Sequence, residues 1–111
     1  MRRRHRSAAS EYIKELHDAI LRLHGAEATY LRSVPVTEKF QGQIVWDGTV
    51  EVFKLEGHPV ASLAYAWAFD ADAPKPHREY VAVLRIAPVT SPKLAVRAAI
   101  VQEYRTSAKK S

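Results

Sequence analysis

The chain has 111 residues, of which 47% are hydrophobic and 26% charged, a composition typical of a folded globular protein rather than a disordered one. It contains no cysteine, which excludes disulfide bonds, thiolate nucleophiles and cysteine-ligated zinc, and which fits a cytoplasmic protein. The formal net charge is +5, but six of the basic residues lie at the two ends of the chain: Arg2, Arg3, Arg4, Arg6, Lys109 and Lys110.

Between these ends, positive and negative charges nearly balance. Residues 7–108 hold 11 basic and 12 acidic side chains, so no basic stripe of the kind that holds nucleic acid is expected on the folded body. The longest apolar run, Leu63 to Phe69, is far shorter than the roughly 20 residues that a membrane-spanning helix needs. The sequence therefore predicts a protein without a membrane span.

The charge distribution divides the chain into three parts. Residues 1–6 are predicted to be a basic flexible tail, residues 7–106 a single α+β domain, and residues 107–111 a short basic C-terminal tail. The N-terminal arginines can neutralise phosphates, which makes a polyanion such as nucleic acid a predicted partner of the tail. The alternative is that short basic ends only keep a near-neutral body soluble.

A helix is predicted from Ser7 to about His24. Apolar residues recur every three or four positions in this segment, at Ile13, Leu16, Ile20 and Leu23. Gly25 follows as a natural stop, because glycine readily adopts the left-handed conformation that ends helices.

Two strands are predicted next, from Val34 to Phe40 and from Gln43 to Leu55, with a turn at Gln41-Gly42. Asp47-Gly48 leaves two alternatives open. It is either a two-residue hairpin turn or a glycine bulge within one continuous strand. We favour the bulge, because a turn there would leave a very short following strand.

The second half of the chain is predicted to hold two more strands and a helix. A turn at residues 56–59 precedes a strand from Val60 to Phe69, and a proline-containing loop leads to a strand that ends at Ile86. Ser91-Pro92 then has the serine cap and first-turn proline that commonly begin a helix.

The elements together predict a two-layer α+β sandwich, in which a sheet of about four antiparallel strands carries the N-terminal and the C-terminal helix on one face (α-β-β-β-β-α). The third strand has a small-residue face that suits close helix packing and an aromatic face that would then be open. The candidate interface or stacking residues on the open face are Leu63, Tyr65, Trp67, Phe69 and Tyr80. A homo-oligomer, a base-stacking platform and an ordinary core are the three interpretations of this row.

Few residues are candidates for chemistry. Glu51, on a central strand, is a candidate acid–base residue or a cross-strand partner of Arg85, and His58 is a candidate proton shuttle or a turn residue. The histidine spacing matches no metal motif, so neither metal nor cofactor is expected. Lys93, near the start of the second helix, is a further candidate for polyanion contact.

The sequence contains no specific functional motif. It predicts a small non-enzymatic binding or assembly module that self-associates through its open sheet face and contacts polyanions through its arginines. The alternative is a small enzyme or ligand-binding domain with a pocket between the sheet and the helices.

Overall fold

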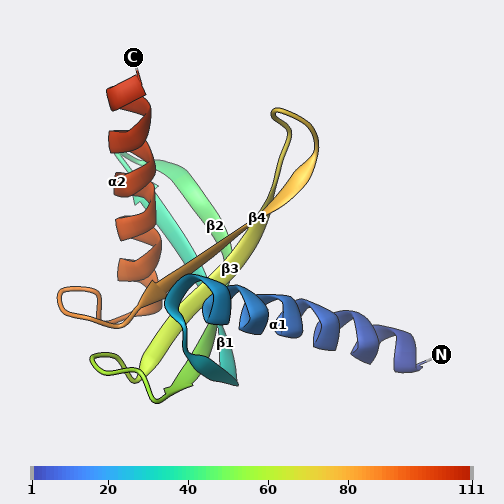
Figure 1. The fold of residues 1–111 in the computed structure, drawn as a ribbon. Coiled ribbons are helices and arrows are strands. Elements are labelled where there is room, and N and C mark those ends of the chain that lie inside the picture. The colour runs from blue at the N-terminus through green and yellow to red at the C-terminus, as the bar shows by residue number, and fades with distance from the viewer. Residues whose placement is uncertain (1, 111) are drawn as a thin grey trace.

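The structure of the protein is a computed structural model that describes residues 2–110, and it describes the side chains of residues 10–103. The elements follow in the order α1 (Arg2–His24), β1 (Glu27–Phe40), β2 (Gln43–Glu56), β3 (Leu63–Ala71), β4 (His77–Leu84) and α2 (Pro92–Lys110). The strands form one open antiparallel sheet in the order β1-β2-β3-β4 (Figure 1). The predicted α+β layout is confirmed.

The helix signals of the sequence act as expected. Gly25, which follows α1, has a φ of +67° and donates its backbone N–H to the carbonyl of Leu21 at 2.8 Å. Ser91 caps α2, because its Oγ accepts the N–H of Leu94 at 3.2 Å, and Pro92 opens the helix.

Both helices are longer than predicted. α1 begins at Arg2 rather than at Ser7, and α2 continues to Lys110. The side chains of the terminal arginines and lysines lie outside the described side chains, so the basic tails stay a prediction.

The hairpin of β1 and β2 decides the question at Asp47-Gly48. The turn lies at Gln41-Gly42, as predicted, and Gly48 pairs with Val36 inside a continuous β2, so the hairpin alternative is wrong. The favoured glycine bulge does not form either, because Asp47 and Gly48 pair in regular register and the shifts lie between Tyr30 and Arg32 and between Glu38 and Lys39. A Cβ at position 48 would approach the Trp46 ring to 3.1 Å, so a larger residue there would require this ring to shift by a few tenths of an ångström.

The third strand starts later than predicted, at Leu63 rather than Val60. The reason is His58, whose Nδ1 accepts the N–H groups of both Val60 and Ala61 at 3.1 Å and holds this segment as a turn. β4 ends at Leu84 rather than Ile86.

The prediction that both helices lie on one face of the sheet is wrong. Leu16 and Ile20 of α1 pack on the face that carries Ala64 and Ala66 of β3, together with Phe53 of β2. The other face carries Val96 and Ala95 of α2 against a second cluster, formed by Val36, Val50, Val52, Tyr65 and Trp67. The alanine face therefore packs against a helix as expected, but the aromatic face also has a helix.

The physical reason is that both faces of the sheet are apolar. In β1, the extra residue at Leu31 shifts the register, so that Ala28 faces α1 whereas Val34 and Val36 face α2. A sheet with apolar side chains on both sides needs cover on both sides. The molecule is accordingly built in three layers rather than two.

The sheet also divides into two arms. The first arm consists of β1 and the first half of β2, and the second arm consists of the second half of β3 and β4. β2 pairs with β3 only from Glu51 to Lys54, so the first half of β2 pairs with β1 alone and the second half of β3 with β4 alone. Figure 1 shows the β3–β4 hairpin extending away from the other two strands.

Candidate functional site

Four of the five predicted interface residues share one face, as expected. Leu63, Tyr65, Trp67 and Phe69 all belong to the α2 side of β3. Because α2 covers this face, Tyr65 and Trp67 are only 2% and 3% exposed, whereas Phe69 at the far end of the row is 42% exposed. The row is thus largely core, with one exposed end.

Tyr80 does not belong to this row. It pairs with Ala68 across β3 and β4, and directly paired residues share a face, which places Tyr80 on the α1 side. There its hydroxyl donates to Glu15 at 3.0 Å. Partial burial of the phenol and the bond to Glu15 raise the pKa of Tyr80.

α2 is fixed against the first arm of the sheet by an ion pair. Both guanidinium nitrogens Nε and Nη2 of Arg97 donate to the carboxylate of Glu38, the second at 3.3 Å, and Glu38 is only 5% exposed. The hydrogen bonds from Arg97 hold the pKa of Glu38 below its usual value. This contact joins α2 to β1.

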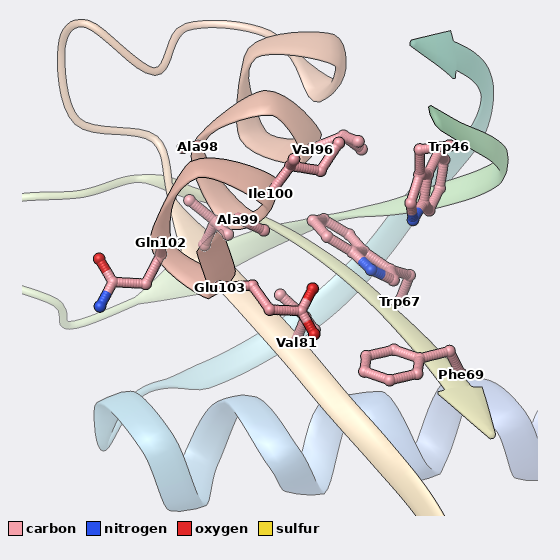
Figure 2. A pocket seen from close by; sticks show the side chains of 11 residues that line it. Trp46, Trp67, Phe69, Val81, Val96, Ala98, Ala99, Ile100, Gln102 and Glu103 are labelled. Atoms are coloured by element: carbon pink, nitrogen blue, oxygen red, sulfur yellow. The ribbon is translucent and has the colours of Figure 1, made fainter. Parts of the chain in front are cut away.

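An apolar cleft of about 720 Å³ lies between α2 and the second arm. Figure 2 shows α2 on one side of it and the aromatic rings of β2 and β3 on the other. Its floor comes from β3 and β4 and its wall from α2; the lining residues are Trp46, Trp67, Phe69, Val81, Val83, Val96, Ala98, Ala99, Ile100, Gln102 and Glu103. The sequence analysis gave a pocket between the sheet and the helices as its alternative, but it assigned Glu51 or His58 to that pocket rather than the residues that line this cleft.

The two tryptophans of the chain meet in this cleft. Their rings pack edge to face, with centroids 5.5 Å apart and an interplanar angle of 67°. Neither indole N–H donates a hydrogen bond to a described residue, and every solvent-inaccessible side-chain N or O atom in the described part has a partner. The indole N–H groups of Trp46 and Trp67 therefore keep some solvent-accessible surface.

A second cavity lies on the opposite face of the sheet, beside α1. It has a volume of about 460 Å³ and is lined by Ser10, Tyr12, Ile13, Tyr30, Ser33 and Glu51. Glu51 is only 7% exposed and accepts a hydrogen bond from the Ser33 hydroxyl, which also lies 2.6 Å from the hydroxyl of Tyr30. The expected ion pair between Glu51 and Arg85 does not form.

His58 and Glu51 are not brought together. His58 stabilises the loop before β3 through its ring nitrogen and lines neither cavity. The structure thus gives the two candidate catalytic residues separate environments, a loop for His58 and a cavity for Glu51.

Two histidines of α1, His17 and His24, have structural roles. His17 contacts Asp18 and Glu27, each at 3.0 Å, and these two carboxylates raise its pKa. His24 lies 2.8 Å from the carbonyl of Ala82. Among the residues with described side chains, no group of three histidine, aspartate or glutamate side chains is placed to hold a metal ion.

The predicted polyanion contacts do not form a single described patch. Lys93 is exposed on the first turn of α2. Figure 1 shows that the N-terminal end of α1, which carries Arg2, Arg3, Arg4 and Arg6, lies on the opposite side of the molecule from the start of α2. Contact between these arginines and a polyanion stays a prediction.

No family model, curated protein or solved structure matches this chain. Within residues 2–110, no helix combines the length and the apolar character that crossing a bilayer requires. The function is therefore argued from the two cavities themselves.

Proposed function

We propose that this protein is a small binding module that holds an apolar molecule in the cleft between α2 and the second arm of the sheet. The observation that carries the proposal is a concave, mainly apolar cavity lined by two tryptophans whose indole N–H groups donate to no described residue. Such a combination, an apolar surface with a few well-placed polar groups, is typical of small-molecule sites. Among the described lining residues, Glu103 is the one ionisable side chain, which favours binding over acid–base catalysis.

The size of the cleft supports a small molecule rather than a protein partner. Its volume of about 720 Å³ falls within the range of known ligand sites. Of its large apolar side chains, Phe69 is the one that is more than a third exposed. A stable protein interface needs roughly 800 Å² from each partner, which recessed walls do not present.

The polar groups define the ligand further. Trp46 and Trp67 are hydrogen-bond donors only, so the ligand that suits them carries an acceptor oxygen. Glu103 at the cleft repels a carboxylate, which favours a neutral acceptor such as a ketone, an ester or an ether. The proposed ligand class is a neutral apolar molecule with a carbonyl or ether oxygen.

The first test compares benzophenone with diphenylmethane, which has nearly the same shape but no acceptor. We expect benzophenone to bind about fivefold more tightly, since one additional hydrogen bond from an indole N–H is worth about 1 kcal/mol. The measurement is NMR of the indole N–H groups, because the chain has two tryptophans and both line the cleft. Benzophenone should move both indole signals downfield.

Two matched variants of α2 control this test. Ala99→Phe places a ring inside the cleft and should abolish binding, whereas Val101→Phe adds the same ring at a position that is 42% exposed and outside the cleft. Equal affinity for the two compounds, or binding that survives Ala99→Phe, would contradict the proposal. Circular dichroism of both variants verifies that they fold.

Self-association is a second candidate function, and a specific observation favours it. The end of the β1–β2 hairpin exposes Phe40 (64%), Ile44 (59%) and Val45 (46%), and one edge of β2 is unpaired over residues 43–50. An open edge with exposed apolar side chains is a template for pairing with another chain. The surface differs from the predicted one, because α2 covers the aromatic face.

The solution mass tests self-association. We expect twice the mass of one chain in sedimentation equilibrium, and Ile44→Lys should return the protein to the monomer because it places a charge in the contact. Val60→Lys, at an exposed apolar position in the loop before β3 and outside this edge, is the matched control and should stay dimeric. A wild-type monomer at all concentrations would eliminate this candidate.

A further inference from the structure

The cavity beside α1 holds a buried carboxylate that the proposed function does not use. Glu51 lies at the end of the segment that pairs β2 with β3, opposite Ala66, and its side chain is more than nine-tenths buried. A buried carboxylate normally has a cation or several hydrogen-bond donors around it, because burial without them is costly.

Glu51 has neither a cation nor several donors around it among the described residues. Its Oε1 accepts one bond, from the Ser33 hydroxyl. No described lysine, arginine or histidine pairs with it, and its Oε2 accepts no hydrogen bond from a described residue. Since no solvent-inaccessible side-chain oxygen of the described residues lacks a partner, Oε2 retains access to the cavity.

The other walls of the cavity suit a positive charge. Tyr30 and Tyr12 contribute aromatic rings, and the hydroxyls of Ser10, Ser33 and Tyr30 contribute acceptor oxygens. The hydroxyl of Tyr12 is already used, since it accepts the N–H of Ala68 at 3.1 Å where β3 has passed the end of its pairing with β2. This bond keeps the Tyr12 ring against the sheet, at the side of the cavity.

We propose that this cavity binds a primary ammonium group, with Glu51 as its counter-ion. An ammonium group has three donors and no acceptor, which matches the carboxylate Oε2 and the neighbouring hydroxyl oxygens. A single carboxylate in a volume of about 460 Å³ suits an alkylammonium better than a metal ion, which requires several charged or carbonyl ligands. The site is separate from the cleft, because the sheet lies between them.

The test uses n-butylammonium and, as its neutral counterpart of similar size, n-butanol. Chemical shifts of the backbone amides of Ser10, Ser33 and Glu51 are followed in the full-length protein. We expect the ammonium ion to bind roughly tenfold more tightly than the alcohol, because hydrogen bonds between charged groups are about twice as strong as neutral ones. Equal affinities, or shifts at other residues only, would overturn the proposal.

A pair of charge-neutralising variants separates a specific site from general attraction of cations. Glu51→Gln keeps the shape of the side chain and should lower the affinity for butylammonium to that for butanol. Glu56→Gln changes the net charge equally, at an exposed position of the same strand, and should leave the affinity unchanged. An equal loss in both variants would show that amines bind carboxylates of this protein in general rather than a site at Glu51, and would overturn the proposal.

The ammonium group can come from a free amine or from a lysine side chain. A blocked lysine amide, N-acetyl-lysine-amide, is therefore titrated beside butylammonium. Binding of butylammonium alone assigns the site to free amines, and binding of both at similar strength extends it to lysine side chains. Binding of neither overturns the proposal, whereas the benzophenone experiment on the other face is unaffected.

Discussion

Replacing Phe53 with alanine is expected to lower the free energy of unfolding by about 3–5 kcal/mol. Phe53 is completely buried at the centre of the cluster beneath α1, where its ring also packs edge to face on Tyr30 with centroids 5.9 Å apart. Truncation removes the apolar surface and leaves a cavity that the surrounding strands cannot fill. Urea denaturation followed by circular dichroism measures the loss.

Val60→Ala is the control for this prediction. Val60 is 70% exposed in the loop before β3, so its truncation should change the stability by less than about 0.5 kcal/mol. A similar loss in the two variants would mean that Phe53 is not part of the core that holds the fold.

Enlarging Ala64 to leucine is expected to have the second largest effect, a loss of about 1–3 kcal/mol. Ala64 is completely buried, pairs with Phe53 across β2 and β3, and lies in the cluster that α1 covers. The closely packed site has no room for three further carbon atoms, so either α1 or the Phe53 ring must move. The measurement is again urea denaturation.

Ala71→Leu controls for the change of residue type. Ala71 is a partly buried residue at the far end of β3, outside both core clusters, and leucine there should change the stability by less than about 0.5 kcal/mol. If Ala64→Leu were as mild, α1 would not be packed against the alanine face as the structure has it.

The order of elements was predictable from local patterns. The period of the apolar residues in α1, the glycine that ends it and the serine and proline that begin α2 depend on neighbours in the sequence. The same is true of the turn at Gln41-Gly42. Asp47-Gly48 shows the limit of such patterns. This dipeptide is typical of hairpin turns, but here it lies within a continuous β2, where the Trp46 ring covers the glycine.

The placement of the helices was not predictable in the same way. The extra residue at Leu31 reverses which side chains of β1 face each helix, and no local pattern marks it. The candidate site depends on the same long-range contacts. Arg97 of α2 pairs with the buried Glu38, 59 positions earlier in the chain, and this pair fixes α2 beside β1. The sequence does not indicate this pair. The sequence analysis could therefore place the aromatic residues of β3 on one face of the sheet but could not place them in a cleft.

The short pairing between β2 and β3 affects how the two hairpins are held together. Only four residue pairs, from Glu51–Ala66 to Lys54–Leu63, join the two hairpins. Both helices bridge this pairing, since α1 contacts β1 as well as β3 and β4, and α2 contacts β1 and β2 as well as β4. The two helices therefore connect the two hairpins on opposite faces of this short pairing. The width of the cleft depends on the angle between the hairpins, which these helix contacts maintain.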